Sequence, residues 1–312
     1  MRAIITGPDG KTGLALREVS MPAPAPNQAL IKVDSFSINP GEARTALSAT
    51  TSYIPGWDFA GVIEESAADG SSPKEGTRVF GVVPNGSWAE YVVARGGLMA
   101  EIPKGVSYAE AAALPVAAVT AQACLETAGP LLGRKVLITG ASGGLGRYAC
   151  QLAHISGAEV YAISRRPDLL NLLKKQDVEV AGIFASIKEA KVAGKYDLIV
   201  ETVGGESLAL ALTALADGGV CANCGNSSGE ATVFDARDFY LMRTNTRLQS
   251  VWLGQDILTG NCTIKLSRLI KLVQNGRLKT PIDRILPWSD FDAATAALLD
   301  GSVNGKIVLS VE

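Results

Sequence analysis

The hydrophobic and polar positions along the chain follow two patterns, and the change between them falls near residue 110. Before that point, Gly and Pro separate short apolar and β-branched runs, which cover residues 29–33, 61–64, 78–83 and 89–93. Short strands interrupted by turn residues are typical of a barrel or a sandwich. The first part of the chain is therefore predicted to be a β-rich domain.

From residue 135 onward, apolar strands alternate with amphipathic helices. Alternation at this spacing predicts βαβ units, and hence a doubly wound parallel sheet covered on both faces. The strands are predicted at residues 135–139, 159–164, 197–200 and 219–224, and the helices at residues 143–156, 168–176 and 205–216.

Between these two parts lies an Ala-rich segment, residues 108–128, which Pro115 interrupts. It predicts a helix that ends near Leu114 and a second helix from about Val119 to Thr127, and we place the domain boundary here. After the alternating part, the tail is predicted to rejoin the first domain, so that residues 1–117 and 257–312 enclose a second domain at 118–256. The elements expected after residue 247 are strands at 248–253, 284–286 and 306–311, and helices at 264–275 and 289–300.

Composition excludes several classes of protein. The 312 residues are 47% hydrophobic and 19% charged, and 29 Lys and Arg against 31 Asp and Glu leave a net charge of −2. This balance gives no excess of basic residues of the kind that binds nucleic acid. The longest apolar stretch, residues 111–119, is far shorter than the roughly 20 residues of a membrane helix. The start of the chain lacks the apolar segment of a signal peptide, so a cytoplasmic location is expected.

The five cysteines are interpreted in the same light. They lie at positions 124, 150, 221, 224 and 262, an odd number in a chain without an export signal. We therefore expect buried thiols in a reducing compartment rather than a disulfide framework.

The strongest motif is a glycine-rich loop between the first strand of the alternating part and its helix, Gly140-Ala141-Ser142-Gly143-Gly144-Leu145-Gly146. Glycines let the chain turn tightly, let backbone N–H groups approach a pyrophosphate and let the helix pack against its strand. We predict that this loop binds a dinucleotide through Ala141, Ser142, Gly143, Gly144 and Leu145. The alternative is an ordinary strand-to-helix turn.

The end of the next strand carries Ser164-Arg165-Arg166, where NAD-binding proteins usually have an acidic residue for the ribose 2′-hydroxyl. A guanidinium can stack on the adenine and pair with a 2′-phosphate, which a carboxylate would repel. We therefore predict NADPH as the cofactor, with Ser164 and Arg165 among its contacts. The alternative is that the arginines are solvated surface charges.

A metal centre is a second possible source of chemistry. The only histidine, His154, lies on the helix after the glycine loop, where a structural or surface role is the simpler interpretation. Cys221 and Cys224 form a CxxC pair on a predicted buried strand, without the second pair that a zinc site needs. We predict no metal site.

Several short motifs follow one another along nearly the whole chain in a specific order. They are Ile38-Asn39-Pro40, Pro55-Gly56-Trp57-Asp58-Phe59-Ala60-Gly61, Gly86-Ser87-Trp88-Ala89-Glu90-Tyr91-Val92, Ala111-Ala112-Ala113-Leu114-Pro115, Thr120-Ala121, the glycine loop, Val203-Gly204-Gly205 and Gly305-Lys306-Ile307-Val308-Leu309. Together they resemble the medium-chain dehydrogenase/reductase superfamily, and within it the zinc-independent quinone oxidoreductase group.

The resemblance implies a GroES-like catalytic domain around a Rossmann domain, with nicotinamide and substrate in the cleft between them. Zinc-containing members carry an early Cys and a His-Glu pair where this chain has Trp57-Asp58, and this chain has no Cys before position 124. Both departures argue against zinc-type alcohol dehydrogenase activity. Many relatives pair the last Rossmann strand across subunits, so a homodimer through residues 248–253 is expected, with that edge covered.

Without a Lewis acid, the substrate must already be electrophilic, as a quinone or a conjugated carbonyl compound is. The enzyme then has to hold the nicotinamide near the acceptor and stabilise the developing oxyanion. The catalytic candidates are Asn39 and Tyr53, although Asn39 could instead form an Asx-turn and Tyr53 could close the cleft by packing. Glu42 stands where the family usually has Asp. Asp58 is interpreted as a structural carboxylate that caps a turn, and the alternative is an acid catalyst.

Further cofactor contacts are expected at the carboxyl edge of the parallel sheet and, by resemblance, at matching family positions. They are Thr120, Gly225, Asn226, Ser227, Trp252, Leu253, Asn304 and Lys306. The leading hypothesis is an NADPH-dependent quinone reductase. One alternative is a reductase of activated C=C bonds in enones, alkenals or enoyl thioesters, and another is a non-catalytic NADPH-binding protein.

Overall fold

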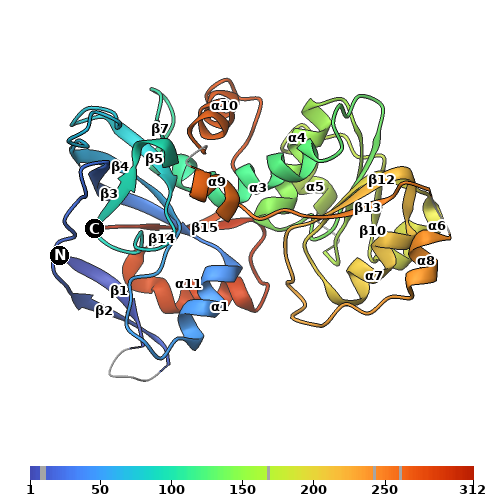
Figure 1. The fold of residues 1–312 in the computed structure, drawn as a ribbon, viewed down its shortest axis with the longest axis horizontal. Coiled ribbons are helices and arrows are strands. Elements are labelled where there is room, and N and C mark those ends of the chain that lie inside the picture. Colours follow the sequence, from blue (N-terminus) through green and yellow to red (C-terminus); the bar gives the residue numbers. More distant parts are fainter. Residues whose placement is uncertain (8–11, 167–168, 242–243, 260–261) are drawn as a thin grey trace. The chain divides into compact units, whose positions relative to one another are not determined.

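The computed structural model describes residues 1–7, 12–166, 169–241, 244–259 and 262–312 (Figure 1). The chain forms two compact units. Unit 1 contains Met1–Val119 and Leu253–Glu312, and unit 2 contains Thr120–Trp252. The chain thus passes between the units at 119/120 and 252/253, against predicted boundaries at 117/118 and 256/257.

Unit 1 is built mainly from strands. Its N-terminal part contains β1 (Arg2–Thr6), β2 (Leu14–Glu18), β3 (Gln28–Ile38), α1 (Pro40–Ser48), β4 (Asp58–Glu65), β5 (Arg78–Val82), β6 (Tyr91–Arg95), the 3-10 helix η2 (Gly96–Leu98), β7 (Met99–Glu101), α2 (Tyr108–Ala112) and the start of α3 (Pro115–Glu126). Its C-terminal part contains α9 (Gly254–Thr259), α10 (Cys262–Gln274), β14 (Ile282–Pro287), the 3-10 helix η3 (Trp288–Asp290), α11 (Phe291–Leu299) and β15 (Lys306–Ser310).

The central strand of unit 1 is β3, which joins distant parts of the chain. The described strands of the main sheet follow the order β14-β15-β3-β4-β5-β7, and β6 also pairs with β3. The last strand, β15, runs antiparallel to β3 with Ile307 opposite Ile38, and Figure 1 shows the red tail beside the blue start of the chain. The C-terminal tail therefore completes the sheet that the N-terminal part begins.

Burial along β3 increases toward its C-terminal end. Along β3, Lys32 and Asp34 are exposed, but every residue from Ser35 to Ile38 is buried because both neighbouring strands cover it. Phe36 stacks on the ring of Trp88 with the ring centroids 6.0 Å apart. The end of β3 thus lies in the interior of unit 1, directly before Asn39.

Unit 2 alternates strands and helices along the chain. They are β8 (Lys135–Ile138), α4 (Gly144–Ile155), β9 (Glu159–Ile163), α5 (Leu169–Lys174), β10 (Gly182–Phe184), α6 (Ile187–Ala193), β11 (Tyr196–Glu201), α7 (Gly205–Thr213), β12 (Leu215–Asn223), α8 (Ala236–Tyr240) and β13 (Arg247–Ser250). The described strands form one sheet in the order β10-β9-β8-β11-β12-β13, and every pairing is parallel. The strand order reverses between β8 and β11, the point at which open α/β sheets bind ligands.

The mixed α/β architecture, with a sheet-rich unit and a parallel-sheet unit, confirms the predicted fold class. Some elements differ from expectation. The helix predicted to start at Val119 starts at Pro115, because proline suits the first helical position, where its missing N–H is not needed. The expected strand at 248–253 is the shorter β13. The predicted start of α5 at Asp168 lies outside the described residues.

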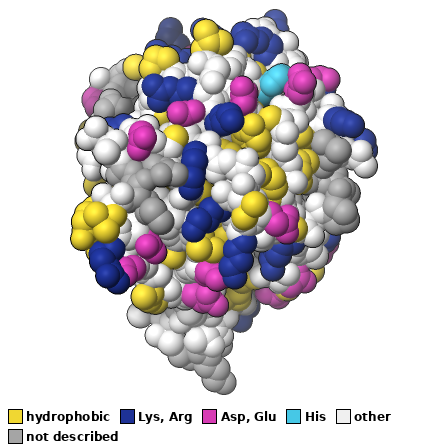
Figure 2. Space-filling view, turned by 90° about the vertical axis from the view of Figure 1, so that its right-hand side faces the viewer, with side chains coloured by type: hydrophobic (Ala, Val, Ile, Leu, Met, Phe, Trp, Pro, Cys, Tyr) yellow, Lys and Arg dark blue, Asp and Glu magenta, His cyan; other side chains and the backbone are white. Residues whose placement is uncertain are grey.

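Three observations bear on the expected partners. Within the described residues, no helix is long and apolar enough to cross a membrane. Figure 2 shows one face of the molecule, where the visible basic and acidic side chains are interspersed. Strand β13 lies at the edge of its sheet, and all four of its residues are exposed.

Candidate active site

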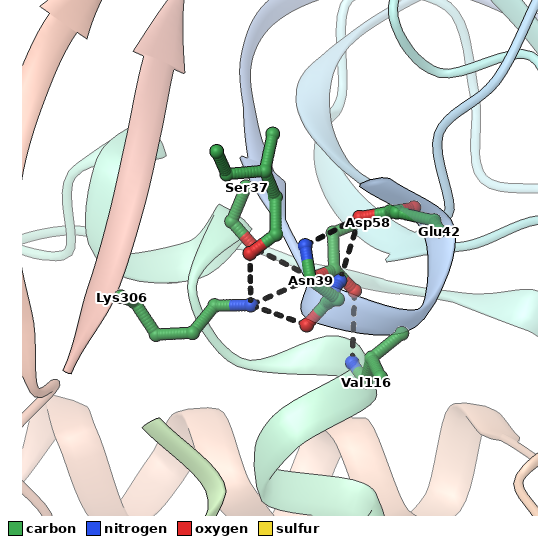
Figure 3. Close-up of polar contacts among 7 residues, drawn as sticks. Ser37, Asn39, Glu42, Asp58, Val116 and Lys306 are labelled. Carbon is green, nitrogen blue, oxygen red and sulfur yellow. Dashed lines mark hydrogen bonds and ion pairs between the residues drawn. The ribbon is translucent and has the colours of Figure 1, made fainter. Parts of the chain in front are cut away.

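A cluster of polar side chains lies buried inside unit 1, where β3 ends. Ser37, Asn39, Glu42, Asp58 and Lys306 make up this polar cluster, and each is almost completely shielded from solvent. They come from β3, α1, β4 and β15, and Figure 3 shows Lys306 and Glu42 on opposite sides of Asn39. Buried polar groups need partners, since an unsatisfied one costs about 1–3 kcal/mol.

The first turn of α1 places two members of the cluster. Asn39 is the N-cap, Pro40 follows at the first helical position, and Glu42 stands at the third. The Asn39 backbone N–H donates to Glu42 Oε1 at 2.7 Å. This contact is half of a capping box, which holds the Glu42 side chain against the start of the helix. Gly41 lies under Trp57, since a Cβ on Gly41 would be 3.2 Å from the ring atom Cη2.

Asp58 is the main acceptor of the cluster. Its Oδ2 accepts hydrogen bonds from Ser37 Oγ, from Asn39 Nδ2 at 2.9 Å and from Lys306 Nζ at 3.3 Å. Its Oδ1 accepts from the backbone N–H of Val116 in the first turn of α3 at 2.8 Å. Asp58 therefore compensates a buried ammonium group and caps a helix, in agreement with its interpretation as a structural carboxylate.

Asn39 and Lys306 are also committed to the cluster. The two hydrogens of the Asn39 amide point to Glu42 Oε1 at 2.9 Å and to Asp58 Oδ2, while its Oδ1 accepts from Lys306 Nζ at 2.6 Å. The Lys306 ammonium also donates to the Ile38 carbonyl oxygen at 3.3 Å. Both residues were predicted to contact ligands, yet the structure uses the Asn39 amide hydrogens and the Lys306 ammonium inside the protein.

Glu42 differs from the other members because one of its carboxyl oxygens lacks a partner. Oε1 accepts two hydrogen bonds from Asn39, but Oε2 is buried without a hydrogen-bond partner among the described residues. Burial and the neighbouring Asp58 charge raise the pKa of Glu42 to about 8, against the smaller opposing effect of Lys306. At neutral pH, Glu42 is therefore mainly the neutral acid.

Tyr53 lies in the segment that precedes β4 and is half-buried. Its backbone N–H donates to Thr6 Oγ1 at 3.1 Å, and its carbonyl accepts from the Thr6 N–H at 2.9 Å. Burial raises the pKa of the Tyr53 phenol, and the charge of Glu42 raises it further. Tyr53 is therefore a phenol donor within the electrostatic range of Glu42.

In unit 2, the glycine-rich loop has the backbone that a dinucleotide requires. Gly140 has a φ of +58°, which favours glycine, and a Cβ on Gly146 would lie 2.3 Å from the Gly140 carbonyl oxygen. Gly143 is the N-cap of the 12-residue helix α4, and a Cβ there would have only one contact, at 3.4 Å. The loop therefore packs tightly on its own strand and leaves the N-terminus of α4, with its unpaired N–H groups, for an anion.

The predicted cofactor residues near this loop occupy different environments. Ala141 is buried, whereas Ser142, Gly143, Gly144 and Leu145 are partly exposed. At the end of β9, Arg165 is exposed and Ser164 is buried, with Ser164 Oγ accepting from the Arg166 N–H at 3.0 Å. A polar turn that carries a guanidinium therefore stands where a carboxylate would favour NAD.

Sequence reasoning missed Glu201, a fully buried carboxylate at the end of β11. It accepts hydrogen bonds from the N–H groups of Val203 and Gly204 and from the side chains of Ser207 and Asn223. Glu201 thereby fixes the turn after β11, beside the glycine loop that follows β8. The signal was an acidic residue at the end of an otherwise apolar strand, Tyr196–Glu201.

The remaining predicted contacts are dispersed. Gly225, Asn226 and Ser227 follow β12 at the carboxyl edge of the sheet, and Asn226 and Ser227 are exposed. Thr120 is buried in α3, while Trp252 is 69% exposed and the adjacent Leu253 is buried. Asn304 is half-buried, immediately before β15.

The thiols are consistent with a reduced protein. All five cysteines are free, and Cys224 alone among them is partly exposed. A hydrogen bond with Cys224, together with burial, raises the pKa of Cys124. In the part of the chain that the structure describes, no group of three or more His, Cys, Asp or Glu could hold a metal ion.

Comparisons with known proteins agree with this architecture. The family described as "Alcohol dehydrogenase GroES-like domain" matches residues 25–104, and that described as "Zinc-binding dehydrogenase" matches residues 144–272. The chloroplast envelope quinone oxidoreductase homolog of Arabidopsis thaliana is 30% identical over 96% of this chain and 94% of that protein. The 2-methylene-furan-3-one reductase of Solanum lycopersicum is 34% identical over 60% of this chain and 52% of its own length.

A solved structure, that of the quinone oxidoreductase from Coxiella burnetii, is similar with a TM-score of 0.84 at 25% identity, covering 100% of this chain and 99% of that one. Together these similarities support an NAD(P)H-dependent reductase. Because the Arabidopsis relative matches over nearly the full length of both chains, the similarity extends to both units. The chain therefore belongs to the medium-chain dehydrogenase/reductase superfamily, in its quinone oxidoreductase group.

Proposed function

We propose that this protein is an NADPH-dependent, zinc-independent reductase that transfers a hydride to quinones or similarly electrophilic carbonyl compounds. The observation that carries the proposal is the glycine-rich loop of unit 2, in which the close approach of Gly146 to the Gly140 carbonyl leaves the N-terminus of α4 for a pyrophosphate. The similarity to a quinone oxidoreductase homolog over 96% of the chain supports the substrate class.

The preference for NADPH rests on the end of β9. Arg165 is exposed there, and Ser164 is buried where an acidic residue would bind the ribose hydroxyls of NAD. A guanidinium can form charge-assisted hydrogen bonds with a 2′-phosphate. When bound, the cofactor supplies the hydride, and Thr120, Gly225, Asn226, Ser227, Trp252, Leu253 and Asn304 remain proposed contacts with it.

Zinc independence is supported by the polar cluster. Trp57 and Asp58 stand at the positions of the zinc ligands of other family members. The two carboxylate oxygens of Asp58 already accept hydrogen bonds, from Lys306, Asn39, Ser37 and the Val116 N–H. Without a Lewis acid, a donor has to stabilise the developing oxyanion. We assign this role to the Tyr53 hydroxyl, and we propose that Asn39 holds Glu42 and Lys306 in position.

The test is oxidation of the reduced nicotinamide, followed by its absorbance, with benzoquinone, phenanthrenequinone and an enone in parallel. Each assay is run with NADPH and NADH, and with and without EDTA. The proposal requires turnover of a quinone that prefers NADPH and does not respond to EDTA. Loss of activity in EDTA that zinc restores would contradict zinc independence, and tight NADPH binding without any turnover would favour a non-catalytic protein.

Reduction of activated C=C bonds is the second candidate function. The observation that favours it is the 34% identity with a 2-methylene-furan-3-one reductase over 60% of the chain. The same hydride chemistry serves both substrates, because an enone and a quinone each develop negative charge on a carbonyl oxygen. Turnover of the enone alone would select this function.

We also propose a homodimer that pairs the exposed edge strand β13 of two copies and buries Leu248, which is 44% exposed in the single chain. Sedimentation of the purified protein at the mass of one chain would contradict it. The expected cytoplasmic location stays a prediction.

A further inference from the structure

Glu42 is the one member of the polar cluster with an oxygen that no described residue satisfies. The side chains of Ser37, Asn39, Asp58 and Lys306 all have hydrogen-bond partners, whereas Glu42 Oε2 is buried and has none among the described residues. The residue is 3% exposed, so bulk solvent does not supply the missing partner. A buried oxygen without a hydrogen-bond partner needs an explanation, and a catalytic role is one of the explanations known for such groups.

The hydrogen-bond pattern determines where a proton on Glu42 resides. Oε1 accepts two hydrogen bonds from Asn39, at 2.7 Å from the backbone N–H and at 2.9 Å from the side-chain amide. An oxygen that accepts two donors has little room for a proton of its own, so the neutral acid carries its proton on Oε2. Asn39 thus orients Glu42 as a proton donor with a free O–H.

The surroundings keep that proton in place at neutral pH. The ionisable groups around Glu42 are Asp58, Lys306 and Tyr53. Burial disfavours the carboxylate first, and the negative charge of Asp58 adds to this effect. Lys306 and the two hydrogen bonds from Asn39 act in the opposite direction, with smaller effects. The Lys306 ammonium is itself bound to Asn39, Asp58 and the Ile38 carbonyl.

Tyr53 is the candidate group to accept the proton from Glu42. Its half-buried phenol lies within the electrostatic range of Glu42, and a hydroxyl group can accept one proton while it donates another. The Tyr53 backbone is held by Thr6, whose side-chain oxygen accepts from the Tyr53 N–H at 3.1 Å and whose backbone N–H donates to the Tyr53 carbonyl at 2.9 Å. The Tyr53 hydroxyl is not a hydrogen-bond partner of Glu42 Oε2 in this structure. The relay therefore requires the two groups to come within reach of each other in the substrate complex, where catalytic hydrogen bonds commonly tighten.

We propose that Glu42 is the proton reservoir of the reductase and delivers its Oε2 proton to the reduced substrate through the Tyr53 hydroxyl. This inference rests on the proposed function and deepens it. Reduction adds a hydride, supplied by the reduced nicotinamide, to the electrophile and leaves an anionic oxygen on the product. Tyr53 gives its O–H proton to that oxygen as Glu42 gives its own to Tyr53, and the resulting Glu42 carboxylate regains a proton from solvent.

The inference requires a neutral Glu42 in the protein without cofactor, which infrared spectroscopy tests directly. The difference spectrum between wild type and Glu42→Gln should contain the C=O stretch of a protonated carboxyl group at neutral pH. That band should disappear as the pH rises through about 8. A carboxylate band at neutral pH would overturn the proposal, whatever the activity of the protein.

The kinetic test uses the full chain with phenanthrenequinone and NADPH. Glu42→Gln keeps an oxygen for the two Asn39 donors but cannot deliver a proton, so kcat should fall about 10²-fold, the usual contribution of a general acid. Wild-type kcat should decline as the pH rises through about 8, and this limb should vanish in Glu42→Gln. The matched control is Glu64→Gln, an exposed carboxylate on β4, which should leave kcat and its pH profile unchanged.

Further variants separate a proton relay from a structural role. Glu42→Asp keeps a protonatable group and should retain the limb at reduced kcat, while Tyr53→Phe should lose kcat by a similar factor to Glu42→Gln. Unchanged NADPH affinity in the variants shows that unit 2 is intact. If Glu42→Gln fails to fold, the solvent isotope effect on kcat tests the relay instead. The relay predicts a large isotope effect in the wild type and its loss in Tyr53→Phe.

The outcomes also separate this inference from the proposed function. If wild type turns over no electrophile, the proposed function fails irrespective of Glu42. If wild type is active and Glu42→Gln keeps both its kcat and the high-pH limb, the proposed function stands and the role of Glu42 is wrong.

Discussion

The two units of this protein prepare their chemistry in different ways. The glycine-rich loop of unit 2 works through backbone geometry in a single stretch of seven residues, Gly140–Gly146. The polar cluster of unit 1 works through side chains from four elements, β3, α1, β4 and β15. A local motif can be recognised along the chain, whereas a dispersed cluster exists only after the sheet has formed.

The difference also concerns how each region tolerates change. In unit 2, the loop depends on the absence of side chains at Gly140 and Gly146: a Cβ on Gly146 would meet backbone, and one on Gly140, at a φ of +58°, would meet the Thr202 side chain. In unit 1, the cluster depends on mutual compensation, because Lys306 and Asp58 are 4% and 0% exposed and would each be costly alone. Steric substitutions should therefore disturb the first region, and charge-changing substitutions the second.

The largest effect is expected from Asp58→Ala. This change removes the acceptor of Lys306, Asn39 and the Val116 N–H, and it leaves the Lys306 ammonium buried without its counter-charge. Breaking such a pair from one side destabilises by about 3–5 kcal/mol. Urea denaturation measures the loss, and the exposed Glu64→Ala should stay within about 0.5 kcal/mol of wild type.

The double variant Asp58→Ala/Lys306→Met sharpens this result. Removing both charges leaves no unpaired ion, so the double variant should be more stable than Asp58→Ala alone. If adding Lys306→Met to Asp58→Ala costs further stability, the buried charge is not the reason for the loss.

The next effect concerns the backbone of unit 2. A Cβ on Gly146 would lie 2.3 Å from the Gly140 carbonyl oxygen, while one on Gly143 would have a single contact at 3.4 Å. We expect Gly146→Ala to lower the free energy of unfolding by about 3 kcal/mol, the upper range for overpacking. Gly143→Ala should change it by no more than about 0.5 kcal/mol. Thermal unfolding of the two variants side by side checks the contrast, which equal melting temperatures would remove.

The parallel sheet of unit 2 could be predicted from the sequence because its strands are continuous apolar runs that turn residues separate from the helices. Boundaries were less certain where one residue supports two interpretations. Pro115 interrupts helices in general, yet here it begins α3. Helix α1 was missed, although Asn39-Pro40-Gly41-Glu42 contains an N-cap, a proline at the first position and a glutamate at the third.

The polar cluster could not be predicted from the sequence in the same way. Asp58 and Lys306 are 248 positions apart, and only the pairing of β15 with β3 brings Lys306 to the end of β3. Glu42 was recognised as a departure from the family pattern, but its unpartnered oxygen depends on which atoms Asn39 occupies. Burial and partner choice are properties of the folded sheet.

A smaller effect follows from the pKa of Glu42, which rises from 4.5 to about 8 on folding. The folded protein then binds more protons than the unfolded chain between these values, so stability falls as the pH rises through this window. This contribution is complete below about pH 4.5 and is lost as the pH passes about 8. Glu42→Gln removes it.

Consequently, the difference in unfolding free energy between Glu42→Gln and wild type should shift in favour of the variant by about 2 kcal/mol between about pH 6 and about pH 7.5, since each pH unit inside the window is worth about 1.4 kcal/mol. Urea denaturation at several pH values measures it, with Glu64→Gln as the control. A constant difference across the window would mean that Glu42 is ionised in the folded protein and that the polar cluster holds two carboxylates.

The smallest effect is expected from Arg165→Ala, because its guanidinium is exposed and solvent screens its interaction with a phosphate. Loss of one such contact should weaken NADPH binding about tenfold and leave NADH binding nearly unchanged, since only NADPH carries the 2′-phosphate. Fluorescence titration with both cofactors measures the ratio, and Arg268→Ala, another exposed arginine, is the control. An equal loss for both cofactors would assign Arg165 to the adenine or the pyrophosphate instead. Arg165 would then contribute to the affinity for both cofactors but not to the choice between them, because the adenine and the pyrophosphate are common to NADPH and NADH, and another group of unit 2 would have to recognise the 2′-phosphate.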